Sequence, residues 1–568
     1  MTGVVTATIL NGQKELKHQY EVLSIDVAKN INRIPYAQLV FVDGDAAKSV
    51  FPLSDTNFFE PGQTIEIRLH YEEKSKTPQK AKTVFKGIVI HHSLQVNIHH
   101  SLLTVELKDA AIALTTQRKN FVFSKGKNKI KDSAIFKEIL QNAKKYGVEE
   151  DTIKPTPVDH TEMVQFCCTD WDFILSRAEA NGHWVRVEDG KISMAPPDLS
   201  PKPKRSFKYG TDNIYEFETD ADIQHLCGVV EGTAWDETKQ TLISSPKQAK
   251  AFSIKQGNLS PKTLADKIGA KQCDLITSSA LNESEVQTWA DAQMIKGRLS
   301  MVRGRIQVPG FADIHLGDVI ELGGMGARFN GKTLVTGVRH QVSSQGWVTD
   351  IQYGMSAHWF THSPDITDVP AAGLLPAVNG LQVGIVDKYE ADPDEKLRVR
   401  VKIPTLEKEA SKGMVWARLT ALDAGANRGT FFRPELGDEV ILGFLNDDPR
   451  QAIILGSLHS KKNQPPWEIT EKNEHKGIVT QKNLKLCFND EDKKETITIE
   501  TPGGNKIILT EESDKGIEII DMNKNSVVMN SNGIEITSCK DMVINAESGE
   551  IILKGKNITL QGDSVDVK

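Results

Sequence analysis

The sequence predicts a mainly β, multidomain protein whose carboxyl-terminal part is a β needle built from several chains. Short runs of alternating apolar and polar residues, separated by turn residues, recur along much of the 568-residue chain. The last eighty residues contain no Phe, Tyr or Trp. In that stretch, aliphatic residues recur every eight positions, at Val528, Ile536, Ile544, Ile552 and Leu560.

The needle is predicted from short strands between polar turns. The runs at 533–537, 541–545, 549–553 and 557–560 each alternate in hydropathy and are followed by Gly, Asn, Asp or Ser. A thin ribbon of five-residue strands is marginal in water, even when its strands are stacked along the chain. The small side chains suit a narrow interior. We therefore predict that the five aliphatic residues at the eight-residue spacing form a core shared by intertwined copies.

The composition is that of an ordinary globular protein. Its length predicts three or four domains, and 39% of its residues are hydrophobic and 26% charged. The net charge of −7 does not favour a polyanion-binding surface. The first residues lack the pattern of a secretory signal, and no run is long enough for a membrane helix. Six cysteines are too few and too scattered for a disulfide scaffold. We expect synthesis in the cytoplasm, without a signal peptide.

The amino-terminal part is predicted to be β-rich with a small helical insertion. Residues 1 to about 115 are mostly β-type. A helix follows over 134–146, with Asp132 and Ser133 before it and Gly147 as its stop. A second helix starts after Thr169 or Asp170 and ends at Asn181-Gly182. The segment from about 215 to 360 returns to β structure, with one further helix near 283–295.

A compact β unit follows a proline-containing linker. It contains Val383–Val386, Leu397–Ile403, Val415–Arg418 and a long segment from Phe431 to Leu458. This order resembles the OB-fold domain of VgrG-type spike proteins, which belong to type VI secretion and related contractile injection systems, including phage baseplates. Met163–Phe166 with Trp171–Ile174 is similar to another segment of that family. Gly331–Val338 resembles the end of its second barrel, and Asn483–Phe488 and Thr501–Ile507 resemble the start of its needle.

The resemblance implies a domain order for the whole chain. Residues 1–360 would form a hub of two β-barrels, with a small α/β part near 116–215. After the linker 361–380, an OB-fold would occupy 381–460. A second linker, 461–476, would lead to a triple-stranded, trimeric β-helix needle over 477–568.

One motif imitates a nucleotide site. Residues 326–333, Gly-Ala-Arg-Phe-Asn-Gly-Lys-Thr, match the Walker A pattern. A phosphate loop needs a helix directly after its Lys-Thr pair, because the N-terminal N–H groups of that helix bind the anion. Here the following residues are β-type, so we predict no cofactor site.

Three other groups are assigned to ordinary structure. The pairs His91–His92 and His99–His100 lie on a predicted hairpin, where neighbouring side chains point to opposite faces. Cys167–Cys168 has no CxxC partner, and the acidic loop 391–395 lacks EF-hand spacing. We predict no metal site, and no grouping of residues predicts a catalytic site.

The leading hypothesis is a structural spike. As the family resemblance implies, a homotrimer would connect the hexameric inner tube of a contractile machine to a membrane-piercing needle. The resemblance includes neither a lysozyme-like insert nor a toxin domain after Lys568, so we expect no enzymatic activity. The expected partners are the inner tube protein, baseplate proteins, an effector cargo, the target membrane in transient contact, and a PAAR-like tip protein at Ser564, Val565, Asp566, Val567 and Lys568. The assembled particle would act outside the cell or in the target cell.

Two alternatives remain open. The first is a tail-associated hydrolase acting on cell wall. The second is an OB-fold that binds single-stranded nucleic acid on its aromatic residues Tyr389, Trp416, Phe431, Phe432 and Phe444. Acidic residues slightly outnumber basic ones in that unit, which argues against the second alternative.

Overall fold

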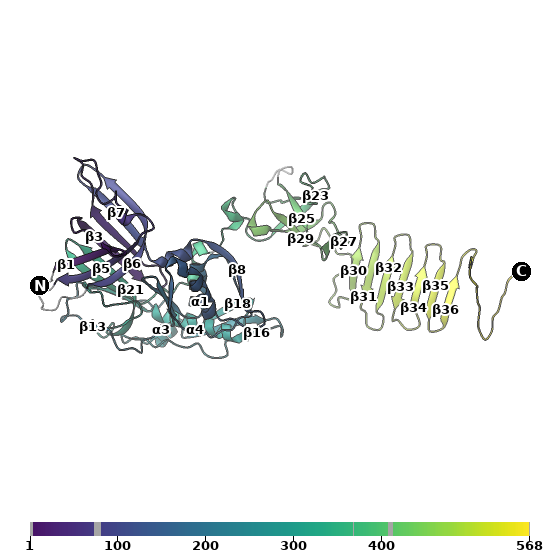
Figure 1. Ribbon diagram of the computed structural model, residues 1–568. Coiled ribbons are helices and arrows are strands. Elements are labelled where there is room, and N and C mark those ends of the chain that lie inside the picture. The colour runs from purple at the N-terminus through teal and green to yellow at the C-terminus, as the bar shows by residue number, and fades with distance from the viewer. Residues whose placement is uncertain (1–3, 73–80, 367, 407–412, 567–568) are drawn as a thin grey trace. The chain divides into compact units, whose positions relative to one another are not determined.

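The computed structural model describes residues 4–72, 81–366, 368–406 and 413–566 (Figure 1). The chain separates into two units, Met1–Asp368 and Val369–Lys568. Within the described ranges, no helix is both long enough and apolar enough to cross a membrane.

The first β-rich half of unit 1 surrounds a core of aliphatic and aromatic side chains, including Phe41, Phe59 and Phe85. Its strands alternate between buried and exposed positions, as half-buried strands must. They are β1 (Val4–Asn11), β2 (Lys14–Glu15), β3 (Val22–Asn30), β4 (Tyr36–Val42), β5 (Thr64–Glu72), β6 (Lys82–Val96) and β7 (Ser101–Lys108), with η1 (Asn57–Phe59) between β4 and β5.

The second β-rich half has a separate core that contains Phe207, Trp184 and Tyr353. Its strands are β13 (Arg205–Lys208), β14 (Glu216–Ala221), β17 (Lys255–Gln256), β19 (Val302–Pro309), β20 (Val319–Gly323), β21 (Gly331–Ser343) and β22 (Gly346–Tyr353). β3 pairs antiparallel with β21, so both halves belong to one fourteen-stranded sheet. The two predicted barrels thus correspond to two cores along a continuous sheet, and among the described strands neither half closes into its own ring.

A small α/β part holds the third core of unit 1. It consists of η2 (Ala110–Thr115), β8 (Arg118–Ser124), α1 (Asp132–Ala143), η3 (Lys144–Tyr146), β9 (Glu149–Ile153), β10 (Glu162–Thr169), α2 (Asp170–Ala180), β11 (Trp184–Glu188) and β12 (Lys191–Ala195). Both helices agree with the sequence prediction. Thr169 caps α2 by accepting a hydrogen bond from the Asp172 N–H, and Gly147 takes a φ of 86° after η3. Asp132 and Ser133, expected before α1, lie inside its first turn and are buried.

A three-stranded sheet of unit 1 packs on a long helix. Its strands β15 (Val229–Asp236), β16 (Thr241–Ser244) and β18 (Gln272–Ala280) lie beside α4 (Glu283–Leu299), with α3 (Pro261–Lys267) in between along the chain. Asn282 and Glu285 form a capping box at the start of α4. A disulfide joins Cys227 to Cys273, a bridge that the cysteine count did not predict.

Unit 2 begins with short turns and a closed five-stranded barrel. The barrel order is β23-β24-β25-β29-β28, the strand count of an OB-fold, and its core includes Val401, Ala417 and Leu442. The elements from the end of unit 1 through this barrel are η4 (Phe360–His362), η5 (Pro364–Ile366), η6 (Pro370–Gly373), β23 (Gln382–Lys388), β24 (Val399–Lys402), β25 (Met414–Leu419), β26 (Ala424–Gly425), β27 (Arg428–Gly429), β28 (Glu439–Phe444), η7 (Leu445–Asp447) and β29 (Ala452–Ser457).

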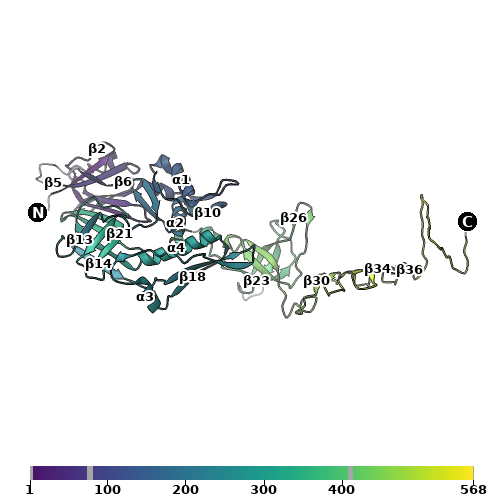
Figure 2. The same cartoon turned by 90° about the horizontal axis from the view of Figure 1, so that it is seen from below.

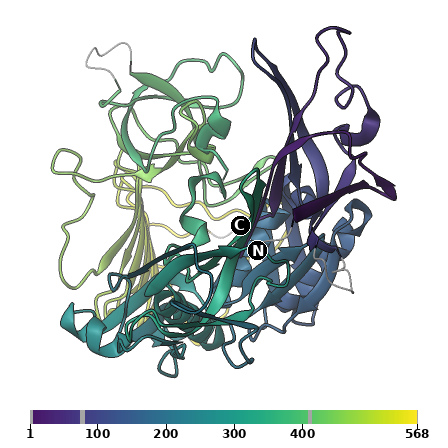
Figure 3. The same cartoon turned by 90° about the vertical axis from the view of Figure 1, so that its left-hand side faces the viewer.

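Seven further strands form what we call the carboxyl-terminal sheet. They are β30 (His475–Val479), β31 (Lys485–Asn489), β32 (Thr496–Glu500), β33 (Lys506–Thr510), β34 (Gly516–Ile520), β35 (Ser526–Asn530) and β36 (Gly533–Thr537), each paired antiparallel with the next. Seen edge-on in Figure 2, the sheet is a single layer, and in Figure 3 its strands overlap one another. The strand predicted at 533–537 is therefore β36, whereas the described residues 538–566 carry no strand.

Candidate assembly surface

The carboxyl-terminal sheet carries most of its large apolar side chains on one face, which we call the apolar face. Side chains directly opposite each other across paired strands share a face. Two rows of such pairs run across the sheet. One row contains Ile478, Leu486, Ile499, Ile507, Ile519, Val527 and Ile536, and the other contains Phe488, Ile497, Leu509, Ile517, Met529 and Ile534.

In the single chain this apolar face is uncovered. Ile499, Ile519 and Ile536 are 46%, 44% and 59% exposed, whereas the core aliphatics of unit 1 are almost wholly buried. A hollow of about 590 Å³ follows the first row past Ile507 and Val527. Contiguous apolar patches of this kind mark interaction sites, because soluble monomers rarely expose them.

The opposite face is more polar and contains Val528. Its central column passes through Thr498, Ile508, Glu518, Val528 and Glu535. Val528 therefore does not share a face with Ile536, although both were predicted to point into one core. The reason is the turn between β35 and β36. It pairs Asn530 with Gly533, so cross-strand partners differ by an odd number of residues, and Val527 lies opposite Ile536. An eight-residue step back from Ile536 therefore reaches the wrong face.

The other three predicted core residues lie beyond the last strand. Ile544, Ile552 and Leu560 are 70%, 62% and 65% exposed in a segment without backbone pairing. A strand needs a neighbour for its N–H and C=O groups, and the described part of one chain supplies none here. Whether these residues form a core remains a prediction.

The predicted tip contact lies at the end of this segment. Ser564, Val565 and Asp566 are exposed. Val567 and Lys568 lie outside the described residues.

The Walker-like segment is a loop between strands. β20 ends at Gly323 and β21 begins at Gly331, within the motif itself. Strand β21 thus occupies the place where a phosphate loop requires a helix. The arrangement lacks the N-terminal helix N–H groups that such a site uses.

The histidine pairs belong to the β6–β7 hairpin. His91, His99 and His100 are exposed, while the His92 ring contacts Ser54 Oγ at 2.7 Å and the Phe59 carbonyl oxygen at 3.1 Å. Among the described residues, no group of three or more His, Cys, Asp or Glu side chains is placed to hold a metal ion.

The remaining candidates lie at a strand bulge and in a turn. Cys167 lies at a bulge of β10 with a φ of 45°, and burial raises the pKa of the Cys168 thiol, which disfavours its reactive thiolate. Asp392 accepts hydrogen bonds from three backbone N–H groups of its own loop and pairs with Arg398 at 2.6 Å.

The OB barrel offers few open aromatic faces. Arg398 and Arg400 lie over the Trp416 ring, and Arg433 lies 4.1 Å from the centre of the Tyr389 ring. Since bases stack on bare rings, these two residues are unavailable to single-stranded nucleic acid in this arrangement. Phe431 and Phe432 remain 84% and 62% exposed.

Sequence reasoning missed a buried ionic cluster in unit 1. Asp132 accepts two hydrogen bonds of 2.9 Å from Arg177 and one of 3.1 Å from His160, whose other ring nitrogen lies 3.4 Å from Glu285. Burial opposes the charged imidazole, but the bonds to both carboxylates outweigh it and raise the pKa of His160 to about 9. The charges compensate one another and link α1, α2 and α4.

Three family models match successive parts of this chain. The first is described as the Alg8 N-terminal domain and matches residues 1–344. The type VI secretion system/phage-baseplate injector OB domain matches 382–459. The phage baseplate V C-terminal trimerisation domain matches 480–568, which includes most of the carboxyl-terminal sheet.

Curated relatives match only in part. The chain is similar to the type VI secretion system spike protein VgrG1b of Pseudomonas aeruginosa, with 25% identity over 156 residues, 26% of this chain and 20% of that protein. It is also similar to the actin cross-linking toxin VgrG1 of Vibrio cholerae, with 30% identity over 132 residues, 22% of this chain and 12% of that protein. The matched region thus spans no more than a fifth of either relative.

Among solved structures, a tail protein from Neisseria meningitidis aligns with a TM-score of 0.45 and 14% identity. The alignment covers 63% of this chain and 98% of that protein.

Proposed function

We propose that this chain, which belongs to the VgrG-type spike family and carries an Alg8 N-terminal domain over residues 1–344, forms the trimeric spike of a contractile injection machine. In this role three copies bury their apolar faces against one another. The work of the protein is structural: it transmits axial force and catalyses no reaction.

The observation that carries this proposal is the uncovered apolar face. All of its residues except Ile478 lie within the segment that matches a trimerisation domain. Burying one Ile or Leu side chain contributes about 1.5–3 kcal/mol relative to exposure. Repeated along both rows and in each copy, this gain favours association strongly enough to hold a stiff rod together.

The core of the rod would use the apolar face and then continue into the tail. We propose Val527 in place of Val528 and retain Ile536, Ile544, Ile552 and Leu560. Sister chains would supply the backbone partners that residues 538–566 lack in one chain, so the strands expected at 541–545, 549–553 and 557–560 would form on assembly.

The partners follow from the same role. Unit 1 would dock on a hexameric inner tube and on baseplate proteins, and Ser564–Lys568 would bear a small PAAR-like tip protein. An effector cargo and transient contact with a target membrane complete the set. The machine would be assembled from chain made in the cytoplasm and delivered outside the cell or into a target cell.

The proposal is tested by measuring the molar mass in solution, by light scattering, of the wild type and of variants at two adjacent valines. The wild-type chain, 62.9 kDa, should have three times that mass in solution. Val527→Asp places a carboxylate on the apolar face and should give monomers, because burying an unpaired charge is costly. Val528→Asp adds the same charge at the neighbouring position on the opposite face and should remain trimeric. A monomeric wild type, or trimers of Val527→Asp, would contradict the proposal.

A further inference from the structure

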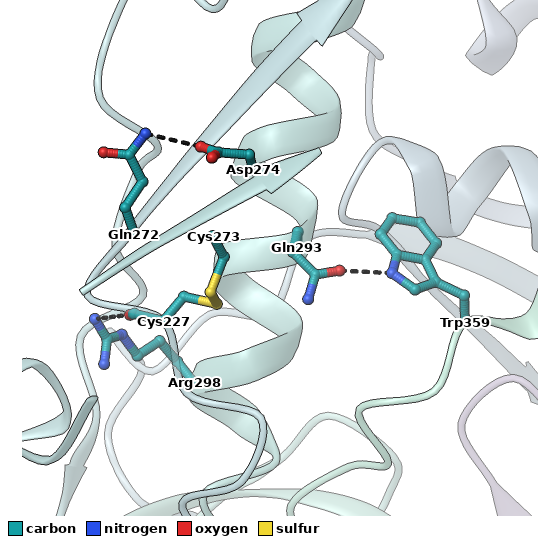
Figure 4. Close-up of a disulfide and its surroundings, with 7 residues drawn as sticks. All are labelled: Cys227, Gln272, Cys273, Asp274, Gln293, Arg298 and Trp359. Atoms are coloured by element: carbon teal, nitrogen blue, oxygen red, sulfur yellow. Dashed lines mark hydrogen bonds between the residues drawn. A yellow bond between two sulfur atoms is a disulfide. The ribbon is translucent and has the colours of Figure 1, made fainter. Parts of the chain in front are cut away.

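The Cys227–Cys273 disulfide joins the segment just before β15 to the start of β18 (Figure 4). β15 and β18 run parallel, with Val229 opposite Gln272 and Val230 opposite Cys273. Cys227 precedes the first pair by two residues. The bridge therefore holds the roots of both strands together and closes a loop with a sequence separation of 46.

The three-stranded sheet that contains Cys273 has a small hydrophobic core. Its core consists of the buried residues Val230, Ala249, Ala290 and Met294, with both bridged cysteines and Leu275 packed beside them. Each of the other cores of unit 1 contains twenty buried residues, many of them aromatic or long aliphatic. A small core supplies little stabilisation, so a covalent link matters more here than elsewhere in the unit.

Helix α4 packs on this sheet and also contacts residues 357–362, through which the chain leaves unit 1. We call these residues the exit segment. One side of α4 packs Ala290 and Met294 against β15. From α4, Gln293 Oε1 accepts a hydrogen bond of 2.6 Å from Trp359 Nε1, and Lys296 pairs with Glu179 (Figure 4 shows the first contact). Glu179 in turn accepts a hydrogen bond of 2.6 Å from the Phe360 N–H.

The same elements line a cavity of about 670 Å³. Leu275 of β18, Trp289 and Gln293 of α4, and Trp359 and His362 of the exit segment all line it. On the side of the cavity, hydrogen bonds to α4 and α2 support the exit segment, while Phe360 also packs against the third core of unit 1.

α4 packs on β15 and β16, and β18 adds Cys273 and Leu275 to the same small core. Separation of β18 from β15 would open this core beneath α4 and weaken the support that α4 gives to the exit segment.

We propose that Cys227 and Cys273 form a redox-closed staple that is open in the reducing cytoplasm and closes after the machine reaches an oxidising medium. The staple then stiffens the anchor through which load passes out of unit 1. Disulfides are rare in cytosolic proteins because thiol reductants keep cysteines reduced, so a bridged pair points to work outside the cytoplasm. The proposal of a load path rests on the proposed spike function.

The chemistry requires a thiol oxidant, for which we name a low-molecular-weight disulfide. The thiolate of one cysteine attacks this disulfide, forms a mixed disulfide and releases one thiol. The thiolate of the second cysteine then attacks the protein-bound sulfur, forms the Cys227–Cys273 bond and releases the second thiol. The two cysteines lose two protons and two electrons, and the small disulfide takes them up as two thiols.

To test when the Cys227–Cys273 bond forms, free thiols are trapped in the full-length chain. Cells and released particles are quenched in acid, alkylated, reduced, and alkylated again with an isotopic label before mass spectrometry. We expect Cys227 and Cys273 to be reduced in cytoplasmic chain and bridged in released particles. The four cysteines outside the bridge, Cys167, Cys168, Cys487 and Cys539, should stay alkylatable in both. A bridge already complete in the cytoplasm, or absent from released particles, would overturn the proposal.

The stiffening is tested by hydrogen exchange on the wild-type trimer before and after mild reduction. Amides of β15, β18 and the segment 357–362 should exchange about ten- to a hundredfold faster after reduction, while β3 and β4 should not change. Paired Cys227→Ser and Cys273→Ser substitutions should reproduce the reduced state, and Cys539→Ser serves as the control. Equal exchange in both redox states would overturn the load-path part.

These readouts separate the staple from the spike function. Light scattering on the same samples reports trimer formation. In our proposal the apolar face drives this step, and neither bridged cysteine belongs to that face. A trimer without redox-dependent exchange rejects the load path and leaves the proposed spike intact. A monomer with the predicted bridge rejects the proposed spike, and the load path with it, but leaves the redox-dependent bridge intact.

Discussion

Unit 1 and the carboxyl-terminal sheet use the same residue types in opposite ways. In unit 1, β-branched and aromatic residues such as Ile25, Phe41 and Ile174 are 1% exposed or less. In the carboxyl-terminal sheet, Ile497, Ile507 and Ile517 are 38–39% exposed, although they alternate with polar residues just as regularly. The difference lies in what covers the strands. Unit 1 folds its sheet over cores of its own, whereas the carboxyl-terminal sheet is a single layer of short strands whose apolar face no described residue of unit 2 covers.

Alternation in hydropathy therefore predicts a strand with one apolar face, but it does not determine which chain buries that face. A self-contained core should respond to substitutions through its stability. A shared core should respond through assembly. The following variants separate these two outcomes.

The largest effect is expected from Ile544→Asp. If the tail forms strands only between sister chains, a carboxylate there is buried without a partner, and detergent-resistant trimers should disappear. Asn545→Asp, which adds the same charge one position further along, should retain them. Electrophoresis without boiling measures both. Resistant trimers of Ile544→Asp would show that this residue does not point inward.

A large effect on stability, without loss of assembly, is expected from Phe136→Ala. Phe136 of α1 is fully buried in the third core of unit 1. Truncation of such a ring lowers the free energy of unfolding by about 3–5 kcal/mol through lost burial and a cavity. Denaturant unfolding of unit 1 should report this loss, while light scattering still gives a trimer. Phe488→Ala, on the apolar face, should show the reverse pattern.

A smaller effect is expected from pH through His160. Its folded pKa of about 9 exceeds the ordinary value of 6.5, so its stabilisation is complete below pH 6.5 and is lost as the pH rises through 9. Asp132 acts in the opposite range: its pKa lies below the ordinary 3.8, so its contribution is lost only in acid. The unfolding temperature of unit 1 should fall between pH 6.5 and 9.

His160→Gln should remove most of that slope and cost roughly 1–3 kcal/mol at pH 6. The exposed His99→Gln is the matched control and should leave the slope intact. An unchanged slope in His160→Gln would assign the pH dependence to other groups.

The smallest effect is expected at the start of α2. Thr169→Ala removes the cap that accepts the Asp172 N–H and should cost about 1 kcal/mol, while Thr169→Ser should stay within a few tenths. Thermal unfolding of unit 1 distinguishes the two. Assembly should be unaffected by either change, because Thr169 lies in the self-contained unit.

Much of the architecture could be predicted from local patterns. The two helices near residues 134 and 171, their Gly147 and Thr169 boundaries, and the β-rich segments around them follow from periodicity and capping, which are short-range effects. The resemblance around 431–458 identified the OB barrel. The Walker-like loop was assigned to strands because its following residues were β-type.

The cluster around Asp132 and the Cys227–Cys273 bridge could not be predicted in the same way. Asp132 meets His160 and Arg177, which are 28 and 45 residues away. The two bridged cysteines are separated along the chain by α3 and the three strands β15, β16 and β17. Side chains so far apart meet only because packed elements bring them together, and no local pattern encodes that meeting.

By itself, the sequence determined which segments are strands or helices and that the tail carries a stripe of aliphatic residues, because alternation and turn chemistry act between near neighbours. The tertiary structure decided which of those aliphatics share a face. The turn at 531–532 sets the register of β35 against β36 and so exchanges Val528 for Val527 in the apolar row. Since side chains alternate with a period of two, one residue of register reverses a whole face, and only the paired strands reveal it.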